Sequence, residues 1–155
     1  MGRKSTERTV AMKENFARGL DIVLGLESRT ITNDPKDPGG LTIWGLSKKY
    51  NPEIYVGMPE TEIENIFYEK YWKTAGCNEA PFPMDICLFD GAVNPQDDKK
   101  LPGAGNKEIL LQKPDDWKDF LFLRMVRYMK NSQRVYVLGH IQRIIKLYEQ
   151  ILSLN

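Results

Sequence analysis

The feature that most constrains the fold is an apolar helical stripe that ends abruptly at a segment of prolines and glycines. Residues 15–27, NFARGLDIVLGLE, repeat apolar side chains at helical spacing; the stripe comprises Phe16, Leu20, Val23 and Leu24, widened by Ile22 and Leu26. Pro35, Pro38 and the pair Gly39–Gly40 follow closely. Because the residue before a proline is restricted to extended conformations, a helix cannot continue through this segment. The sequence therefore predicts a helix followed by a proline-pinned loop.

The segment after the loop has the composition of a short strand or hairpin arm. Residues 40–47, GLTIWGLS, combine β-branched and aromatic side chains with glycine. Further helices are predicted over segments 58–73, 82–94, 107–112, 115–131 and 135–152, with a polar surface loop rich in glycine and proline at residues 96–106. We therefore expect a mainly α fold of the α+β kind, a helical bundle with a small β-hairpin after the first long helix.

Composition narrows the possible functions. The 155 residues are 41% hydrophobic and 28% charged with a formal charge of +1, which fits one globular body and disfavours a dedicated nucleic-acid binder. Cys77 and Cys87 suggest buried free thiols, with a bridge as the alternative. His140 is the single histidine, so neither a serine–histidine triad nor a multi-histidine metal site is expected. Acid–base chemistry would have to come mainly from carboxylates.

Two features concern the cellular location. No apolar run of about 18 residues is present, so no membrane span is expected. Residues 1–10 lack the apolar stretch of a signal peptide and are predicted to be an unstructured polar start. A cytoplasmic protein is therefore expected.

Glu27 occupies an unusual place for a charged residue. It continues the apolar stripe at the last turn of its helix, where burial and the negative end of the helix dipole both favour the protonated form. Glycoside hydrolysis needs such a proton donor and a second carboxylate in a more polar place. Asp37 in the loop fits the second role, with Asp34 as the reserve, and Thr42 could position water. The alternative is a surface glutamate followed by turn-forming aspartates.

The same segment resembles a known family. FARGLDIVLGLE and NDPKDPGGLTIWGLS are similar to glycoside hydrolase family 108, lysozyme-like N-acetylmuramidases of bacteria and phages. The family pattern is a helix ending in Glu-Gly-Gly, then Asn-Asp-Pro-x-Asp-Pro-Gly-Gly-x-Thr. The resemblance continues in YEKYW at 68–72 and PFPMDICLFDGAVN at 81–94. VLGHIQR at 137–143 resembles the Gly-Trp-x-x-Arg segment of a predicted peptidoglycan-binding region.

The resemblance implies a lysozyme-like fold that cleaves peptidoglycan glycan strands without a metal or cofactor. Glu27 corresponds to the motif glutamate, the general acid, and Asp37 and Thr42 fall on motif positions. It divides the chain into a catalytic region, 1–112, and a helical hairpin, 113–155, that resembles the wall-binding region and packs on the same core. The expected protein is a monomeric endolysin that stays in the cytoplasm until release, or a virion-associated enzyme.

Departures from the family pattern support a second hypothesis, an inactive wall-binding or virion structural protein on the same scaffold. Ser28 and Arg29 replace the two glycines after Glu27, and Arg29 could pair with that glutamate. Pro95 stands where the family often has glycine. His140 replaces the tryptophan of the Gly-Trp pair, which weakens the case for wall binding by that segment.

Several further residues have two interpretations. Asp34 and Trp44 are candidate sugar contacts, Trp44 through stacking if it faces a groove rather than the core. Asn94 could bind acetamido groups or cap a helix, and Asp90 is favoured as a buried structural acid over a site residue. The basic series Arg124, Arg127, Lys130 and Arg134 is expected to be a solvated face that could meet an anionic wall polymer.

Overall fold

The computed structural model describes residues 2–94, 103–131 and 133–154, with side chains from residue 13 onward except at residue 131. Its helices are α1 (Gly2–Glu27), α2 (Glu60–Ile66), the π-helix η1 (Phe67–Trp72), α3 (Met84–Val93), α4 (Ala104–Leu111), α5 (Trp117–Asn131) and α6 (Arg134–Leu152). Its strands are β1 (Ile31–Thr32), β2 (Thr42–Ile43) and β3 (Leu46–Ser47). The predicted mainly α fold with a small β-element after the first helix is confirmed.

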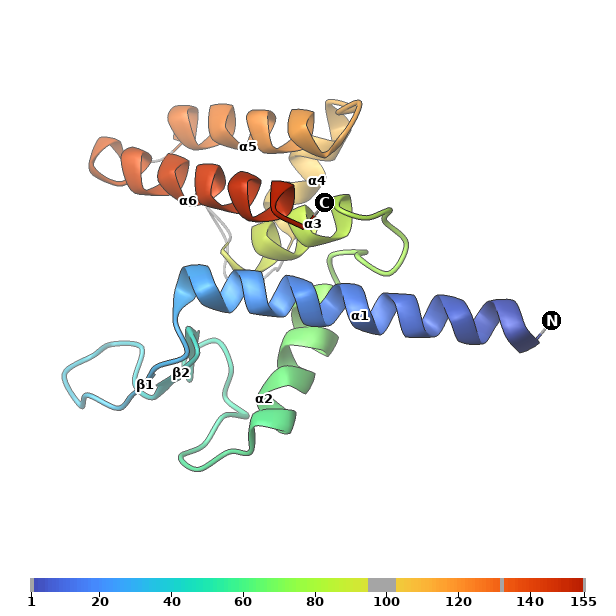
Figure 1. The fold of residues 1–155 in the computed structure, drawn as a ribbon. Helices are drawn as coiled ribbons and strands as arrows, with labels where there is room; N and C mark the ends of the chain where they lie inside the picture. The colour runs from blue at the N-terminus through green and yellow to red at the C-terminus, as the bar shows by residue number, and fades with distance from the viewer. Residues whose placement is uncertain (1, 95–102, 132, 155) are drawn as a thin grey trace.

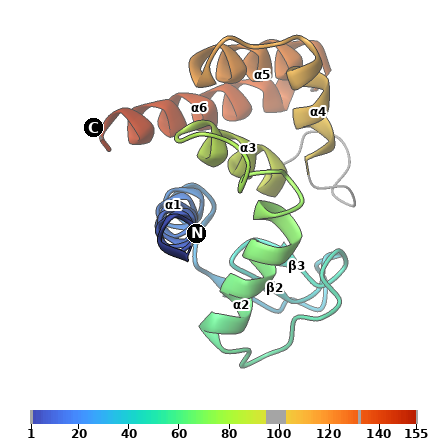
Figure 2. The same ribbon diagram turned by 90° about the vertical axis from the view of Figure 1, so that its right-hand side faces the viewer.

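The helices form layers on either side of α1. Helices α5 and α6 lie side by side on one side, and α3 and α4 connect them to α1 (Figures 1 and 2). Helix α2 and the small sheet lie on the opposite side of α1, so the C-terminal end of α1 is placed between the sheet and α6. This arrangement puts Glu27, the last residue of α1, where the two sides meet.

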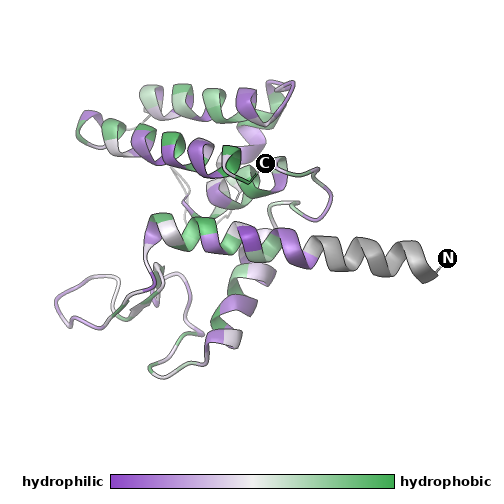
Figure 3. Ribbon diagram, viewed as in Figure 1, coloured by the Kyte–Doolittle hydropathy of each residue, from purple (hydrophilic) through white to green (hydrophobic). Residues whose placement is uncertain are grey.

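The elements share one hydrophobic core. It includes Val23 of α1, Phe67 and Trp72 of η1, Ile86 and Phe89 of α3, Phe120 and Tyr128 of α5, and Ile144 and Leu147 of α6. Figure 3 shows apolar residues near the C-terminal end of α1 and on the helices above it. Helix α3 is buried along nearly its whole length, as its continuous apolar sequence predicts. Because α5 and α6 contribute to this core, the C-terminal hairpin packs on the body that carries Glu27.

The β-element is a three-stranded antiparallel sheet in the order β1-β2-β3. Strands β2 and β3 pair Ile43 with Leu46, so only Trp44 and Gly45 form the turn. Both have positive φ, 51° and 82°, as a type I′ hairpin turn requires. Glycine adopts this conformation without strain, whereas Trp44 adopts it because its ring is buried. Burial of the side chain therefore fixes the turn.

Some predictions are corrected or completed by the structure. Helix α1 begins at Gly2, so the predicted unstructured start is wrong. Cys77 and Cys87 are free and buried, as expected. The predicted surface loop at residues 96–106, with Pro95 before it, falls largely outside the described residues. None of the described helices is both long enough and apolar enough to cross a membrane.

Candidate active site

The chain turns sharply after Glu27 and brings the hairpin next to the end of α1. Ser28 takes a φ of 126°, a conformation that suits the glycine of the family pattern. Its hydroxyl oxygen accepts a hydrogen bond from the Thr30 amide at 3.1 Å, and the Trp44 amide donates to the Thr30 carbonyl at 2.9 Å. A Cβ atom on Gly45 would lie 3.6 Å from Glu27 Oε2. The hairpin turn and the glutamate are therefore direct neighbours.

Glu27 lines a cleft of about 380 Å³ between the loop, the hairpin and the end of α3. Asp37, Thr42 and Asn94 line the same cleft. The remaining lining residues are Pro38, Gly39, Gly45, Leu46, Ser47, Lys49, Tyr50, Asn51, Tyr71 and Val93. A volume of this order falls within the range of small-ligand sites. The tertiary structure thus brings together four of the six predicted site residues.

The two loop aspartates are placed differently. Asp37 Oδ1 accepts a hydrogen bond from the Gly39 amide at 2.8 Å, and Asp34 Oδ1 accepts one from the Lys36 amide at 2.9 Å. Both side chains thereby close turns at the prolines, the structural role that the alternative interpretation gives them. Asp37 also lines the cleft, whereas Asp34 does not. Of the two, Asp37 shares the cleft with Glu27.

Of the other predicted site residues, Thr42 and Asn94 line the cleft and Trp44 does not. Thr42 is half-buried on β2 with its hydroxyl 3.4 Å from the Gly40 carbonyl, and Asn94 follows the last turn of α3 at the cleft wall. Trp44 is 4% exposed and does not line the cleft. The expectation that Trp44 faces the groove is therefore wrong, because its ring fills the core beneath the hairpin. The Arg29 guanidinium lies 5.3 Å from the centre of that ring.

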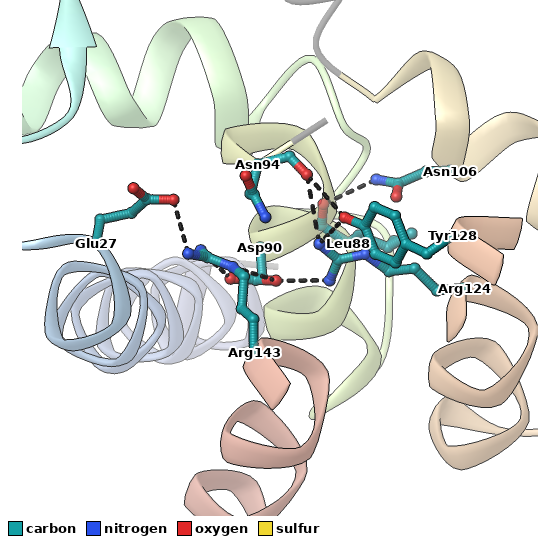
Figure 4. Close-up of polar contacts among 8 residues, drawn as sticks. All are labelled: Glu27, Leu88, Asp90, Asn94, Asn106, Arg124, Tyr128 and Arg143. Carbon is teal, nitrogen blue, oxygen red and sulfur yellow. Dashed lines mark hydrogen bonds and ion pairs between the residues drawn. The ribbon is translucent and has the colours of Figure 1, made fainter. Parts of the chain in front are cut away.

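Glu27 is ion-paired, but not with its neighbour in sequence. Arg29 binds Asp21 at 2.7 Å, so the expected pairing of Arg29 with Glu27 does not form. Instead Arg143 Nη1 of α6 donates to Glu27 Oε1 at 2.7 Å, while its Nη2 donates to Asp90 Oδ1 at 2.6 Å (Figure 4). The Glu27 side chain is 27% exposed, so it remains partly accessible to solvent while its Oε1 binds the arginine.

Asp90 joins two arginines at the centre of this network. It is fully buried, and Arg124 Nη1 donates to its Oδ2 at 2.5 Å. Burial acts to raise the pKa of Asp90, but the positive charges of Arg124 and Arg143 outweigh it and hold that pKa below its usual value. Tyr128 donates to the Asn94 carbonyl at 3.1 Å and accepts from Arg124 Nη2 at 3.0 Å. The structural role predicted for Asp90 holds, with guanidinium groups as its partners.

Sequence patterns did not identify the arginines of this network. Arg124 and Arg127 are buried, so their assignment to a solvated face is wrong. The sequence signal for Arg143 is its position at the end of VLGHIQR, the segment that resembles a peptidoglycan-binding region. His140 of the same segment stacks on Tyr128, with ring centroids 4.4 Å apart. Burial and the charges of Arg124 and Arg143 lower the pKa of His140.

The glycosyl hydrolase 108 family model matches residues 20–95. The expected resemblance to the glycosyl hydrolase 108 family is confirmed over this segment. The match includes Glu27, Asp37, Thr42 and Asn94, hence all four predicted residues that line the cleft. No curated protein and no solved structure matches the chain. Among the residues that the structure describes, no group of three or more histidine, cysteine, aspartate or glutamate side chains is placed to hold a metal ion.

Proposed function

We propose that this glycosyl hydrolase 108 protein is an N-acetylmuramidase that cleaves the β-1,4 bond between N-acetylmuramic acid and N-acetylglucosamine in peptidoglycan. The observation that carries the proposal is the position of Glu27. The glutamate of the family motif lies on a cleft with a second carboxylate, Asp37, and a hydroxyl, Thr42. Two carboxylates on one cleft are what glycosidic hydrolysis requires.

Each residue has a distinct role in the proposed reaction. Glu27 donates a proton to the oxygen of the leaving sugar, and Asp37 acts as base or stabilises the positive charge that develops on the other sugar. Thr42 positions the attacking water, and Asn94 binds an acetamido group. In the structure the same carboxyl group also binds Arg143 Nη1 through its Oε1.

The biological setting follows from the proposed substrate. Peptidoglycan glycan strands are the partner, and the protein acts as a monomeric endolysin that remains in the cytoplasm until lysis, or as a virion-associated enzyme. In this proposal the C-terminal hairpin, residues 113–155, contributes contacts to the wall polymer.

A second candidate is a non-enzymatic wall-binding or virion structural protein. Two observations favour it: the strained Ser28 where the family has glycine, and the ion pair that neutralises Glu27. Both would be tolerated in a scaffold that no longer needs a proton donor.

Clearing of a peptidoglycan suspension by the wild type and by Glu27→Gln separates the two candidates. Glu14→Gln is the matched control, since it makes the same change at an exposed position of the same helix. The muramidase proposal expects clearing by the wild type and Glu14→Gln, and loss of at least ~100-fold in rate for Glu27→Gln. Equal clearing by all three proteins would reject Glu27 as the acid. Pelleting with walls without clearing would support the second candidate.

The bond that is cut is tested separately. Muropeptides released by the wild type are reduced and separated by mass. A muramic acid reducing end supports a muramidase, and a glucosamine reducing end would instead identify a glucosaminidase.

A further inference from the structure

Arg143 lies outside the segment that matches the glycosyl hydrolase 108 family, yet it contacts the motif glutamate directly. We infer that Arg143 is a positioning residue for Glu27, and that Asp90 anchors it in that role. The inference rests on the proposed function, because it concerns the same cleft. It gives α6 a part in the reaction that differs from binding the cell wall.

The guanidinium of Arg143 is fixed by Asp90 before it reaches Glu27. Its Nη2 donates to Asp90 Oδ1 at 2.6 Å and its Nε lies 3.5 Å from Asp90 Oδ2, while only Nη1 points to Glu27. A planar guanidinium held along one edge presents its remaining donors in a set direction. Figure 4 shows Arg143 lying between the two carboxylates. Glu27 therefore binds a guanidinium group that Asp90 of α3 holds in position.

Asp90 is itself held firmly. It has no exposed surface. Its Oδ1 accepts a hydrogen bond from Arg143 Nη2, and its Oδ2 accepts one from Arg124 Nη1. Arg124 is buried and further bound to the Tyr128 hydroxyl. The anchor of Arg143 is thus part of the hydrophobic core that α3 and α5 share, and it does not depend on Glu27.

The charges of this cluster balance. Glu27 and Asp90 contribute two negative charges, and Arg124 and Arg143 contribute two positive charges. The two contacts to Asp90 keep Arg143 in place. Arg143 therefore holds the glutamate at the cleft. The other charged or titratable groups on this cleft are Asp37, Lys49, Tyr50 and Tyr71.

The test compares Arg143→Met with Arg29→Met. Both remove one positive charge near the C-terminal end of α1, but Arg29 binds Asp21 and does not touch Glu27. We expect Arg143→Met to lower kcat by ~10-fold or more with little change in KM, since Glu27 loses its fixed orientation. Arg29→Met should leave kcat and KM unchanged. An Arg143→Met enzyme with wild-type kcat would overturn the inference.

A second variant covers the case in which Arg143→Met does not fold. Arg143→Lys keeps the charge but cannot hold both carboxylates, so kcat should fall while the melting temperature stays closer to that of the wild type. A wild-type kcat in Arg143→Lys would contradict the inference that Glu27 is positioned by a guanidinium bound to both carboxylates.

A thermal double-mutant cycle separates failure of this inference from failure of the proposed function. The cycle combines Glu27→Gln with Arg143→Lys and needs no activity. Non-additive changes in stability are expected, because the two side chains interact directly. Additive changes would overturn the ion pair and with it the inference. Coupling without any wall clearing by the wild type would instead reject the muramidase proposal and the positioning role that depends on it.

Discussion

Asparagine in place of Asp85 or Asp90 should change stability at pH 7 in opposite directions. Both aspartates lie on α3 and both are almost fully buried, at 2% and 0% exposed. Asp90 is held by Arg124 and Arg143, whereas the partners of the Asp85 carboxylate within the described part of the chain are neutral, including the Ile86 amide at 2.8 Å and Asn15 Nδ2 at 3.1 Å. The same substitution therefore removes a paired charge at one position and an unpaired charge at the other.

Asp90→Asn should destabilise the protein. It leaves Arg124 buried without a countercharge, which costs ~3–5 kcal/mol and lowers the melting temperature by roughly 6–20 °C in a chain of this length. Because the folded-state pKa of Asp90 is depressed, its contribution is present above the unfolded pKa of about 4. That contribution is lost as the pH falls further, so the deficit of the variant should persist from pH 8 down to about pH 5.

Asp85→Asn should stabilise the protein at pH 7. Burial raises the pKa of Asp85 to about 6, against the opposing hydrogen bonds from Ile86 and Asn15. Between pH 4 and pH 6 the folded state consequently binds more protons than the unfolded state, so wild-type stability falls as the pH rises. The asparagine avoids this cost, and the expected gain is ~1–2 kcal/mol at pH 7, allowing for screening by solvent. The gain should vanish near pH 4.

Thermal unfolding of the wild type and both variants, followed by circular dichroism at pH 4, 5, 6, 7 and 8, measures these effects. Losses of similar size for both variants at pH 7 would refute the distinction between a paired and an unpaired buried carboxylate. A gain for Asp85→Asn that is the same at pH 4 and pH 8 would show that it does not arise from ionisation.

Two further predictions concern glycines, each with a control in the chain. Gly45→Ala and Gly57→Ala both place a side chain at positive φ, 82° and 83°, so each should cost ~1–2 kcal/mol in thermal unfolding. Only Gly45 adjoins the cleft glutamate, so only that variant should also slow wall clearing, and equal clearing by the two would contradict the contact. Gly91→Ala should lose ~1–3 kcal/mol because its new Cβ collides with Asn106, whereas Gly139→Ala, which points into open space on α6, should gain ~0.5–1 kcal/mol. Urea unfolding measures both, and a stable Gly91→Ala protein would show that Asn106 can move aside.

Local sequence patterns predicted most of the secondary structure. The helical spacing of apolar residues located the helices, and the composition of residues 40–47 located the hairpin. The patterns also placed Glu27 at the end of its helix and Asp37 in the following turn, because proline and glycine act on the backbone within a few residues. Periodicity failed at Gly2–Arg8, where polar side chains gave no apolar stripe and α1 nevertheless extends.

The environment of each side chain depended on contacts between distant segments. The alternation of residues 40–47 could not say which face of the hairpin is buried, and the packing of the sheet against the core decided that Trp44 points inward. In the same way, Arg124 looked like one member of a basic helical face until α3 placed Asp90 opposite it.

The sequence by itself determined the helices, the hairpin and the family motif with its glutamate, since these depend on residues close together in the chain. Only the tertiary structure decided that Arg143, 116 positions away, is the partner of Glu27. The physical reason is that an ion pair depends on distance in space, and the packing of α6 against α1 sets that distance.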